Sequence, residues 1–184
     1  MNNLEKALND FKAGKFVIVT DDESRENEGD LFILGSAVTP EQMGFMVRYT
    51  SGVICAALTP EIASALKLPM MVKKNQDSKQ TAFTVSVDAK QGLTTGISAQ
   101  ERASTLQFLA DIDSQPSDFV RPGHIFPLVV HEGGLAARQG HTEAAVVMAQ
   151  AVGARPVVAI SEIVNDDGSM ARGAQLQAFA EKHQ

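Results

Sequence analysis

Residues 16–34 read FVIVTDDESRENEGDLFIL, and this stretch decides the fold that the rest of the sequence implies. Residues 16–20 are apolar and mostly β-branched, residues 31–34 are apolar, and both segments favour strands. The residues between them are rich in Asp, Glu, Asn and Gly, which turns favour. The stretch therefore predicts a β-hairpin whose two strands are joined by a strongly acidic loop.

Irregularly alternating helix and strand patterns follow the hairpin. Helical spacing and capping signals predict helices that begin near residues 4, 40, 60, 99, 142 and 174. Capping boxes at Thr39 and Ser98 mark two of these helix starts. Further strands are predicted at residues 53–58, 82–87, 125–130 and 157–164. No repeat or linker interrupts the pattern, so we expect one α+β domain, residues 1–184, with a mixed sheet.

The composition narrows the class of protein. The acidic loop, residues 21–30, carries a net charge of −5 out of −6 for the whole chain, so the rest is nearly neutral. There is no basic stripe and no Trp, which argues against nucleic acid as a partner. A single cysteine excludes an internal disulfide, and the apolar runs are too short to span a membrane. We therefore expect a cytoplasmic protein.

The acidic loop is the first candidate site. Six carboxylates close together repel one another unless a cation or a ligand compensates their charge. Hard oxygen ligands suit Mg²⁺, which binds one or two carboxylates and keeps several waters. A solvated turn between two strands explains the same composition, so the loop alone leaves both interpretations open.

A second group of polar residues, RQGHTE, stands at the start of the helix predicted near residue 142. Free backbone N–H groups and the helix dipole attract anions there, so Arg138, Gly140 and Thr142 are suited to hold a phosphate. A plain Thr cap with Glu143 in the first turn is the alternative. His141 is either a metal ligand or a structural histidine.

Three further residues have side chains of the kind that take part in catalysis. His124 follows Pro and Gly, which can aim it into a cleft as a proton carrier, or leave it exposed on a turn. Glu162 stands in an apolar strand, where it either points to solvent or acts as an acid or base beside a pocket. Cys55 reads most simply as a small buried apolar residue.

A series of motifs follows the acidic loop in order over nearly the whole chain. They are SGVIC at residues 51–55, LPMMV at 68–72, FTV at 83–85, GLTTGIS at 92–98, RPGHIFPL at 121–128, GHTEA at 140–144 and NDDG at 165–168. Together with the loop they resemble the signature of the 3,4-dihydroxy-2-butanone 4-phosphate synthase family.

The resemblance implies a lyase of riboflavin biosynthesis that converts D-ribulose 5-phosphate to L-3,4-dihydroxy-2-butanone 4-phosphate and formate. It implies Mg²⁺ or Mn²⁺ as cofactor, held by Glu26 and His141. The catalytic positions of the family map to His124, Glu162, Asp21, Glu28 and Cys55. The substrate-binding positions map to Arg25, Glu26, Asp30, Thr95, Arg138, Gln139, Gly140, His141, Thr142 and Glu162.

The resemblance also implies a three-layer α+β sandwich, with a mixed twisted sheet and helices on both faces. The family works as a homodimer whose active sites lie at the subunit interface. Its members usually continue through another strand and helix after the position of Gln184, so the domain is expected to lack these. Val129 and Ser161 replace an Arg and a Cys that are common in the family, and neither change removes a mapped catalytic group.

Two other functions fit the sequence less well. A shortened paralogue that binds sugar phosphate without turnover is one alternative, but Glu26, His124, His141 and Glu162 are all kept. A nucleotide-dependent RNA-modification enzyme on a related fold is the other, and the lack of a basic surface disfavours it.

Overall fold

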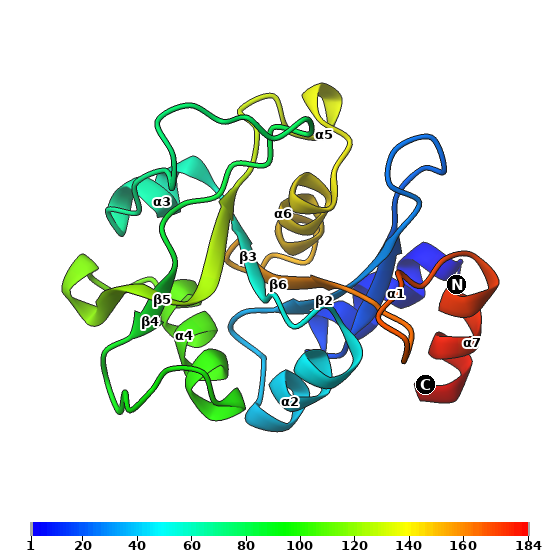
Figure 1. Cartoon of the computed structure of the whole chain (residues 1–184), viewed down its shortest axis with the longest axis horizontal. Helices are drawn as coiled ribbons and strands as arrows, with labels where there is room; N and C mark the ends of the chain where they lie inside the picture. Colours follow the sequence, from blue (N-terminus) through cyan, green and yellow to red (C-terminus); the bar gives the residue numbers. More distant parts are fainter. Residues whose placement is uncertain (1, 184) are drawn as a thin grey trace.

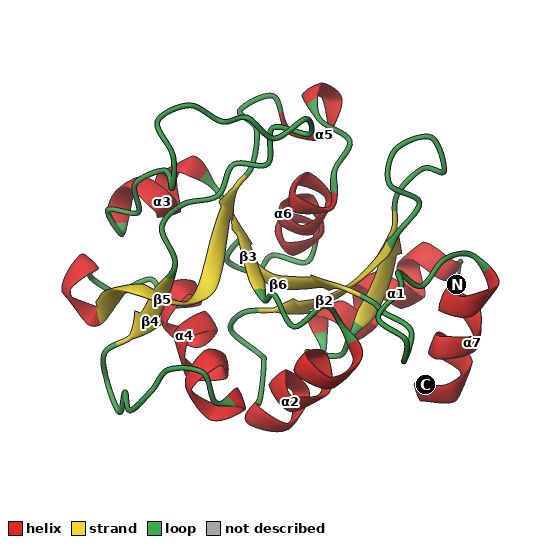
Figure 2. Ribbon diagram, viewed as in Figure 1, coloured by secondary structure: helices red, strands yellow, loops and turns green. Residues whose placement is uncertain are grey.

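The computed structural model describes residues 2–183, which form a six-stranded sheet with helices on both sides (Figures 1 and 2). The strands are β1 (Val17–Thr20), β2 (Gly29–Leu34), β3 (Cys55–Leu58), β4 (Val87–Ala89), β5 (Phe119–Val129) and β6 (Val157–Glu162). The helices are α1 (Asn3–Lys12), α2 (Pro40–Tyr49), α3 (Pro60–Ala65), α4 (Ala99–Ala110), α5 (Gly134–Ala137), α6 (His141–Ala151) and α7 (Ala174–His183), with the 3₁₀ turn η1 (Pro116–Asp118).

The sheet is mixed, as predicted. Its strand order is β1-β2-β6-β3-β5-β4, and every neighbouring pair is antiparallel except β3 and β5. The predicted hairpin is confirmed, because β1 pairs with β2 and Thr20 lies opposite Gly29 across the base of the acidic loop.

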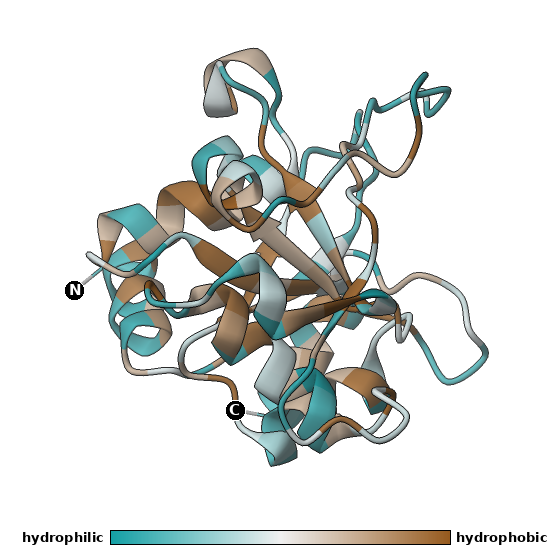
Figure 3. Cartoon of the chain, turned by 90° about the vertical axis from the view of Figure 1, so that its left-hand side faces the viewer, coloured by the Kyte–Doolittle hydropathy of each residue, from teal (hydrophilic) through white to brown (hydrophobic). Residues whose placement is uncertain are grey.

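The expected three layers are confirmed, and they follow from the alternation of side chains along the strands. In β2, Leu31 and Ile33 belong to one hydrophobic cluster, whereas Phe32 and Leu34 belong to the other. Helices α2 and α4 pack on the first face, while α1 and α6 pack on the second (Figure 1). Figure 3 shows the apolar strands at the centre and hydrophilic loops around them.

The predicted capping boxes also form. Thr39 Oγ1 accepts the backbone N–H of Gln42, and Gln42 Oε1 accepts the backbone N–H of Thr39. Ser98 and Glu101 exchange the equivalent bonds at the start of α4. A third box, at Asn2 before α1, was not predicted. These bonds satisfy N–H groups that have no partner within a helix.

The strand predicted at residues 82–87 is wrong. Phe83 and Thr84 form only isolated bridges, with Leu128 and Met70, and β4 begins later at Val87. The segment lies between two neighbours, because Thr84 N–H donates to Pro127 O on one side and Val85 N–H donates to Pro69 O on the other. It is extended, as its alternation indicates, but the bridge on each side is isolated and does not continue into a ladder.

Strand β5 starts earlier than the predicted residues 125–130. It begins at Phe119, and it includes the RPGH motif that the sequence suggested as an approach to the strand. Ala89 pairs with Phe119 and Asp88 with Val120, so β4 supplies partners for this extra part. Among residues 2–183, no helix has the length and apolar character needed to cross a membrane.

Candidate active site

Three side chains meet at one end of the sheet because of strand register. Asp30 at the start of β2 lies opposite Glu162 at the end of β6. Cys55 at the start of β3 lies opposite Ile160, two residues before Glu162 in the same strand. Since side chains alternate between faces, all three point to the face that α6 covers.

Helix α6 places His141 beside these groups. His141 is the first residue of the helix and is buried, with its ring edge toward Phe32 at a centroid distance of 6.2 Å. Its Nδ1 atom lies 3.7 Å from Asp30 Oδ1 and 3.9 Å from Glu26 Oε2. Burial lowers the pKa of His141, which favours the neutral imidazole that binds metal ions.

Asp21 organises the acidic loop. Its Oδ1 accepts the backbone N–H of Glu28 at 3.0 Å, and its Oδ2 accepts the backbone N–H of Glu26 at 3.1 Å. Burial acts to raise the pKa of Asp21, but hydrogen bonds from the Glu28 backbone and the Arg25 side chain hold it below the usual value. The loop is therefore a folded structure around an ionised carboxylate.

Asp21, Glu26 and His141 each offer one ligand atom, and these atoms lie within 4.8 Å of one another. Beside them, Asp30 Oδ1 is buried and accepts no hydrogen bond from the described residues. Burial, followed by the charges of Glu162 and Glu26, raises the pKa of Asp30 well above its usual value. A crowded set of carboxylate oxygens with one imidazole, in which Asp21 and Glu26 share the single cation Arg25, fits a divalent cation.

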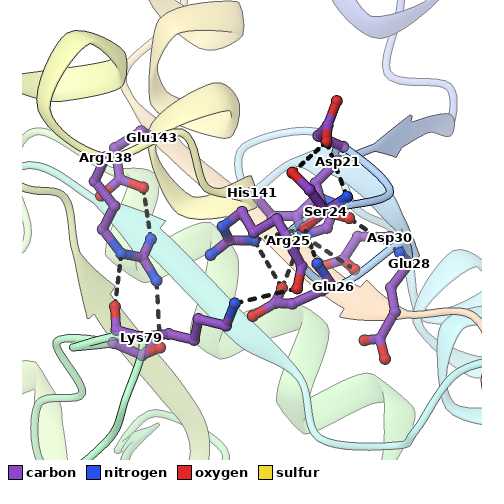
Figure 4. Close-up of polar contacts among 12 residues, drawn as sticks. Asp21, Ser24, Arg25, Glu26, Glu28, Asp30, Lys79, Arg138, His141 and Glu143 are labelled. Atoms are coloured by element: carbon purple, nitrogen blue, oxygen red, sulfur yellow. Dashed lines mark hydrogen bonds and ion pairs between the residues drawn. The ribbon is translucent and has the colours of Figure 1, made fainter.

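The cations of the site already have carboxylate partners (Figure 4). Arg25 contacts Glu26 at 2.7 Å, and Arg138 contacts the buried Glu143 at 2.6 Å. Arg138 Nε also donates to the backbone oxygen of Lys79, whose Nζ in turn donates to Arg25 O at 3.1 Å. The polar loop at residues 73–80 is thus fastened across the space between the acidic loop and the start of α6.

Glu162 and Cys55 form the floor of this space. Ser51 Oγ donates to Glu162 Oε2 at 2.7 Å, so the carboxylate is held in one orientation. The hydroxyl of Ser161, in the preceding position, lies within hydrogen-bond distance of Thr50 Oγ1 and Val53 O instead. Burial raises the pKa of Cys55, so this residue is a neutral thiol rather than a thiolate.

These residues surround a cavity of about 210 Å³. The predicted site residues that line it are Arg25, Glu26, Asp30, Cys55, Arg138, His141, Thr142 and Glu162. Residues that sequence reasoning did not single out also line it, namely Asp77, Thr81, Phe83, Leu128 and Ile160. The motif containing Phe83 was recognised, but only the fold, through the bridge of Phe83 to Leu128, shows that it faces the cavity.

The remaining predicted residues lie apart from the cavity wall. Asp21 and Glu28 belong to the loop beside it, whereas His124 and Thr95 do not line it within this chain. Gln139 and Gly140 precede α6, and a Cβ atom on Gly140 would lie 2.8 Å from Glu143 Oε2. Gly140 thus leaves room for the pair of Arg138 and Glu143, which is a packing role.

The matching family model and the curated relatives point to the same family. The family model described as 3,4-dihydroxy-2-butanone 4-phosphate synthase matches residues 5–184. The chain is 53% identical over 183 residues to the probable bifunctional riboflavin biosynthesis protein RIBA 2, chloroplastic, of Oryza sativa subsp. japonica, covering 98% of this chain and 33% of that protein. It is 49% identical to the 3,4-dihydroxy-2-butanone 4-phosphate synthase of Histophilus somni, covering 97% of this chain and 84% of that protein.

Similar folds are found among solved structures. A crystal structure of 3,4-dihydroxy-2-butanone 4-phosphate synthase in complex with two magnesium ions matches with a TM-score of 0.95 and 50% identity, covering 100% of this chain and 90% of that one. The chain spans less than half of the length of several curated relatives, such as the rice protein and the RibBA protein of Nocardia farcinica. By its sequence motifs, its fold and these matches, the chain belongs to the 3,4-dihydroxy-2-butanone 4-phosphate synthase family.

Proposed function

We propose that this protein converts D-ribulose 5-phosphate to L-3,4-dihydroxy-2-butanone 4-phosphate and formate, with the help of a divalent cation. The observation that carries the proposal is the meeting of Glu26, Asp30 and His141 in one cavity, within a chain that belongs to this family. The two products together contain every atom of the substrate. No oxidant or co-substrate is therefore needed.

Glu26 and His141 are the proposed metal ligands. A Mg²⁺ or Mn²⁺ ion bound there would supply positive charge for substrate oxygens that become negative during enolisation and skeletal rearrangement. One carboxylate and one imidazole leave several coordination positions for sugar oxygens and water. The unpartnered Oδ1 of Asp30, next to this pair, is placed to receive a hydroxyl group of the sugar.

Glu162 is the proposed proton carrier within the chain. It lines the cavity and is half-buried, and its carboxylate is held by the hydroxyl of Ser51. A carboxylate fixed in this way can take a proton from a sugar carbon or hydroxyl and return it at a later step. The place of Glu162 in the cavity wall supports this role over that of a solvent-facing glutamate.

The phosphate is proposed to lie at the start of α6, near Arg138 and Thr142. Both residues line the cavity, and the free N–H groups of the first helical turn attract anions. Arg138 is held by Glu143, Lys79 and Thr81, so its guanidinium is fixed before the substrate arrives. Such fixation reduces the entropy lost when the substrate binds.

We also propose a homodimer in the cytoplasm. His124 and Thr95 do not line the cavity of their own chain, although both match family positions that act on the substrate. A partner subunit that brings its His124 to this cavity would complete the set of family positions that act on the substrate. Because Cys55 is buried and is the single cysteine, the protein has no need of an oxidising compartment.

Formate release tests the activity. Purified protein with ribulose 5-phosphate and Mg²⁺ is expected to release formate, and chelation of the metal is expected to abolish release. Glu26→Gln should be inactive, while the matched control Glu23→Gln, an exposed residue of the same loop, should remain active. The proposal fails if formate does not form, or if it forms equally well without a divalent cation.

Mixing two inactive variants tests the dimer. His124→Ala and Glu26→Gln are each expected to be inactive alone. After subunit exchange, about a quarter of the sites should combine an intact Glu26 with an intact partner His124, and activity should return to about that level. If the variants exchange subunits without any recovery of activity, each site is built from one chain only.

A further inference from the structure

We propose that Asp88 is a positioning residue that holds the imidazole of His124 with its Nε2 atom toward the substrate. The proposal rests on the function proposed above, in which His124 transfers protons. No motif drew attention to Asp88, which lies in the short strand β4.

Both oxygens of Asp88 are used by His124. Asp88 Oδ2 lies 2.7 Å from His124 Nδ1, and Asp88 Oδ1 accepts the backbone N–H of His124 at 2.7 Å. Asp88 is 2% exposed, whereas the side chain of His124 is 39% exposed. The carboxylate is therefore inside the fold and the ring points outward from it.

The pairing fixes which nitrogen carries the proton. An ionised carboxylate only accepts hydrogen bonds, so the Nδ1 atom of a neutral His124 must be the donor. The lone pair then lies on Nε2, at the exposed end of the ring, where a base is needed. When Nε2 takes a proton, the nearby carboxylate stabilises the imidazolium that forms, as in a Ser-His-Asp triad.

An irregularity between two strands creates the contact. Val87 pairs with Ile125, but the next residue, Asp88, pairs with Val120, so residues 121–124 bulge out of the ladder. Strand bulges re-aim side chains and are common beside active sites. Here the bulge lets one side chain, Asp88, reach both the backbone and the ring of His124.

Two glycines leave room for this arrangement. A Cβ atom on Gly123 would overlap the peptide that joins Val87 to Asp88. A Cβ atom on Gly96 would overlap Asp88 Oδ2 and lie 2.7 Å from His124 Nδ1, and Gly96 has a positive φ of +85°. The RPGH and GLTTG motifs therefore pack around one carboxylate–imidazole pair.

No other ion pair within residues 2–183 accounts for the position of Asp88 beside His124. Among the described residues, His124 is the one ionisable partner of Asp88 within ion-pair distance. Arg102 is buried nearby, but its NH1 donates to the backbone oxygen of Gly52 instead. Asp88 thus lies beside β5 with both carboxylate oxygens directed at one residue, His124.

Kinetics of Asp88→Asn test the role, since this change keeps the size of the side chain and removes its charge. We expect kcat for formate release to fall at least about tenfold, with little change in KM, because the substrate is still bound. Asp111→Asn, an exposed aspartate after α4, is the matched control and should behave as wild type. A folded Asp88→Asn protein with wild-type kcat would overturn the proposal.

Nitrogen NMR reports which ring nitrogen of His124 carries the proton. This property would not change in Asp88→Asn if Asp88 served only to stabilise the fold. In the wild-type protein we expect the Nδ1–H tautomer, assigned by comparison with His124→Gln, and a mixture of tautomers in Asp88→Asn. A wild-type ring protonated on Nε2 in its neutral form would contradict the proposal even if Asp88→Asn does not fold. Since this measurement needs no turnover, its result is independent of whether the wild-type protein releases formate.

Discussion

Glu26 Oε2 lies 3.9 Å from His141 Nδ1, although one residue belongs to the β1–β2 loop and the other to the start of α6. The loop and the helix are brought together because β2 pairs with β6, and α6 packs on the face of the sheet that these strands share. A proposed metal site thus depends on the register of the sheet as much as on the acidic loop.

Glu26→Gln is expected to weaken Mg²⁺ binding at least about tenfold, which corresponds to a loss of about 1.4 kcal/mol. The amide keeps the size of the side chain but removes the charge that attracts the ion. Titration calorimetry with Mg²⁺ measures the effect directly, with Glu23→Gln as control. Normal Mg²⁺ affinity in Glu26→Gln would show that the ligand assignment is wrong.

Asp30→Asn is expected to stabilise the metal-free protein at neutral pH. Because burial raises the pKa of Asp30, the folded state holds this proton more tightly than the unfolded state. Stability from this group is therefore present below the unfolded pKa, near 3.9, and is lost as pH rises toward the folded pKa. Asparagine does not ionise, so the Asp30→Asn protein does not lose this stability as the pH rises.

Urea unfolding in the presence of a chelator measures this effect. The free energy of unfolding of Asp30→Asn should exceed that of the wild type by about 1 kcal/mol or more at pH 7, and the gain should disappear near pH 4. An equal gain at both pH values would mean that the charge of Asp30 is not its cause. Formate release should be lost in the same variant, since the carboxylate proposed to receive a hydroxyl group of the sugar is gone.

Local patterns in the sequence predicted the hairpin and every helix start except that of α5, and the family resemblance added further residues of the cavity wall. Apolar runs, β-branched in the first strand, predicted the strands of the hairpin, and side-chain caps at Thr39 and Ser98 predicted two helix starts. The resemblance then supplied Glu26 and His141 as a pair. That the two residues are neighbours follows from the packing of α6, which local patterns do not contain.

The errors fall where partners distant in sequence decide the structure. Residues 82–87 alternate like a strand, yet their pairing with the segments on either side stops at isolated bridges, and β4 begins only at Val87. The early start of β5 depends on pairing with β4, including Asp88, whose importance no local signal revealed. Likewise, Glu143 lies in the first turn of α6 as predicted, but its ion pair with Arg138 depends on the fold and no local pattern indicated it.

Arg138→Met is expected to affect stability and substrate binding together. Glu143 is only 1% exposed, so removal of its cation leaves a buried carboxylate without an opposite charge. The cost is about 3–5 kcal/mol of unfolding free energy, and KM for ribulose 5-phosphate should rise as well. Urea unfolding and steady-state kinetics measure the two effects on the same preparation.

The double variant Arg138→Met, Glu143→Gln separates the two effects. Neutralising Glu143 should restore most of the lost stability, because the unpaired charge is gone, while KM should stay high. If KM returned to the wild-type value together with stability, Arg138 would serve the fold and not the phosphate. If neither returned, Glu143 would not be the reason why Arg138→Met is unstable.

Cys55 is expected to contribute shape to the cavity rather than a thiolate. Its side chain is 6% exposed, and burial, followed by the charges of Glu162 and Asp30, raises its pKa, so at pH 8 the thiol is protonated. Because the thiolate is the reactive form, an aromatic disulfide reagent should react with the native protein far more slowly than with the urea-unfolded chain. Cys55→Ala should then lower kcat moderately, through the loosened cavity wall, and leave the dependence of kcat on pH unchanged between pH 6 and 9. Rapid labelling of the native protein, or the loss of a titration step in Cys55→Ala, would instead identify Cys55 as a proton carrier.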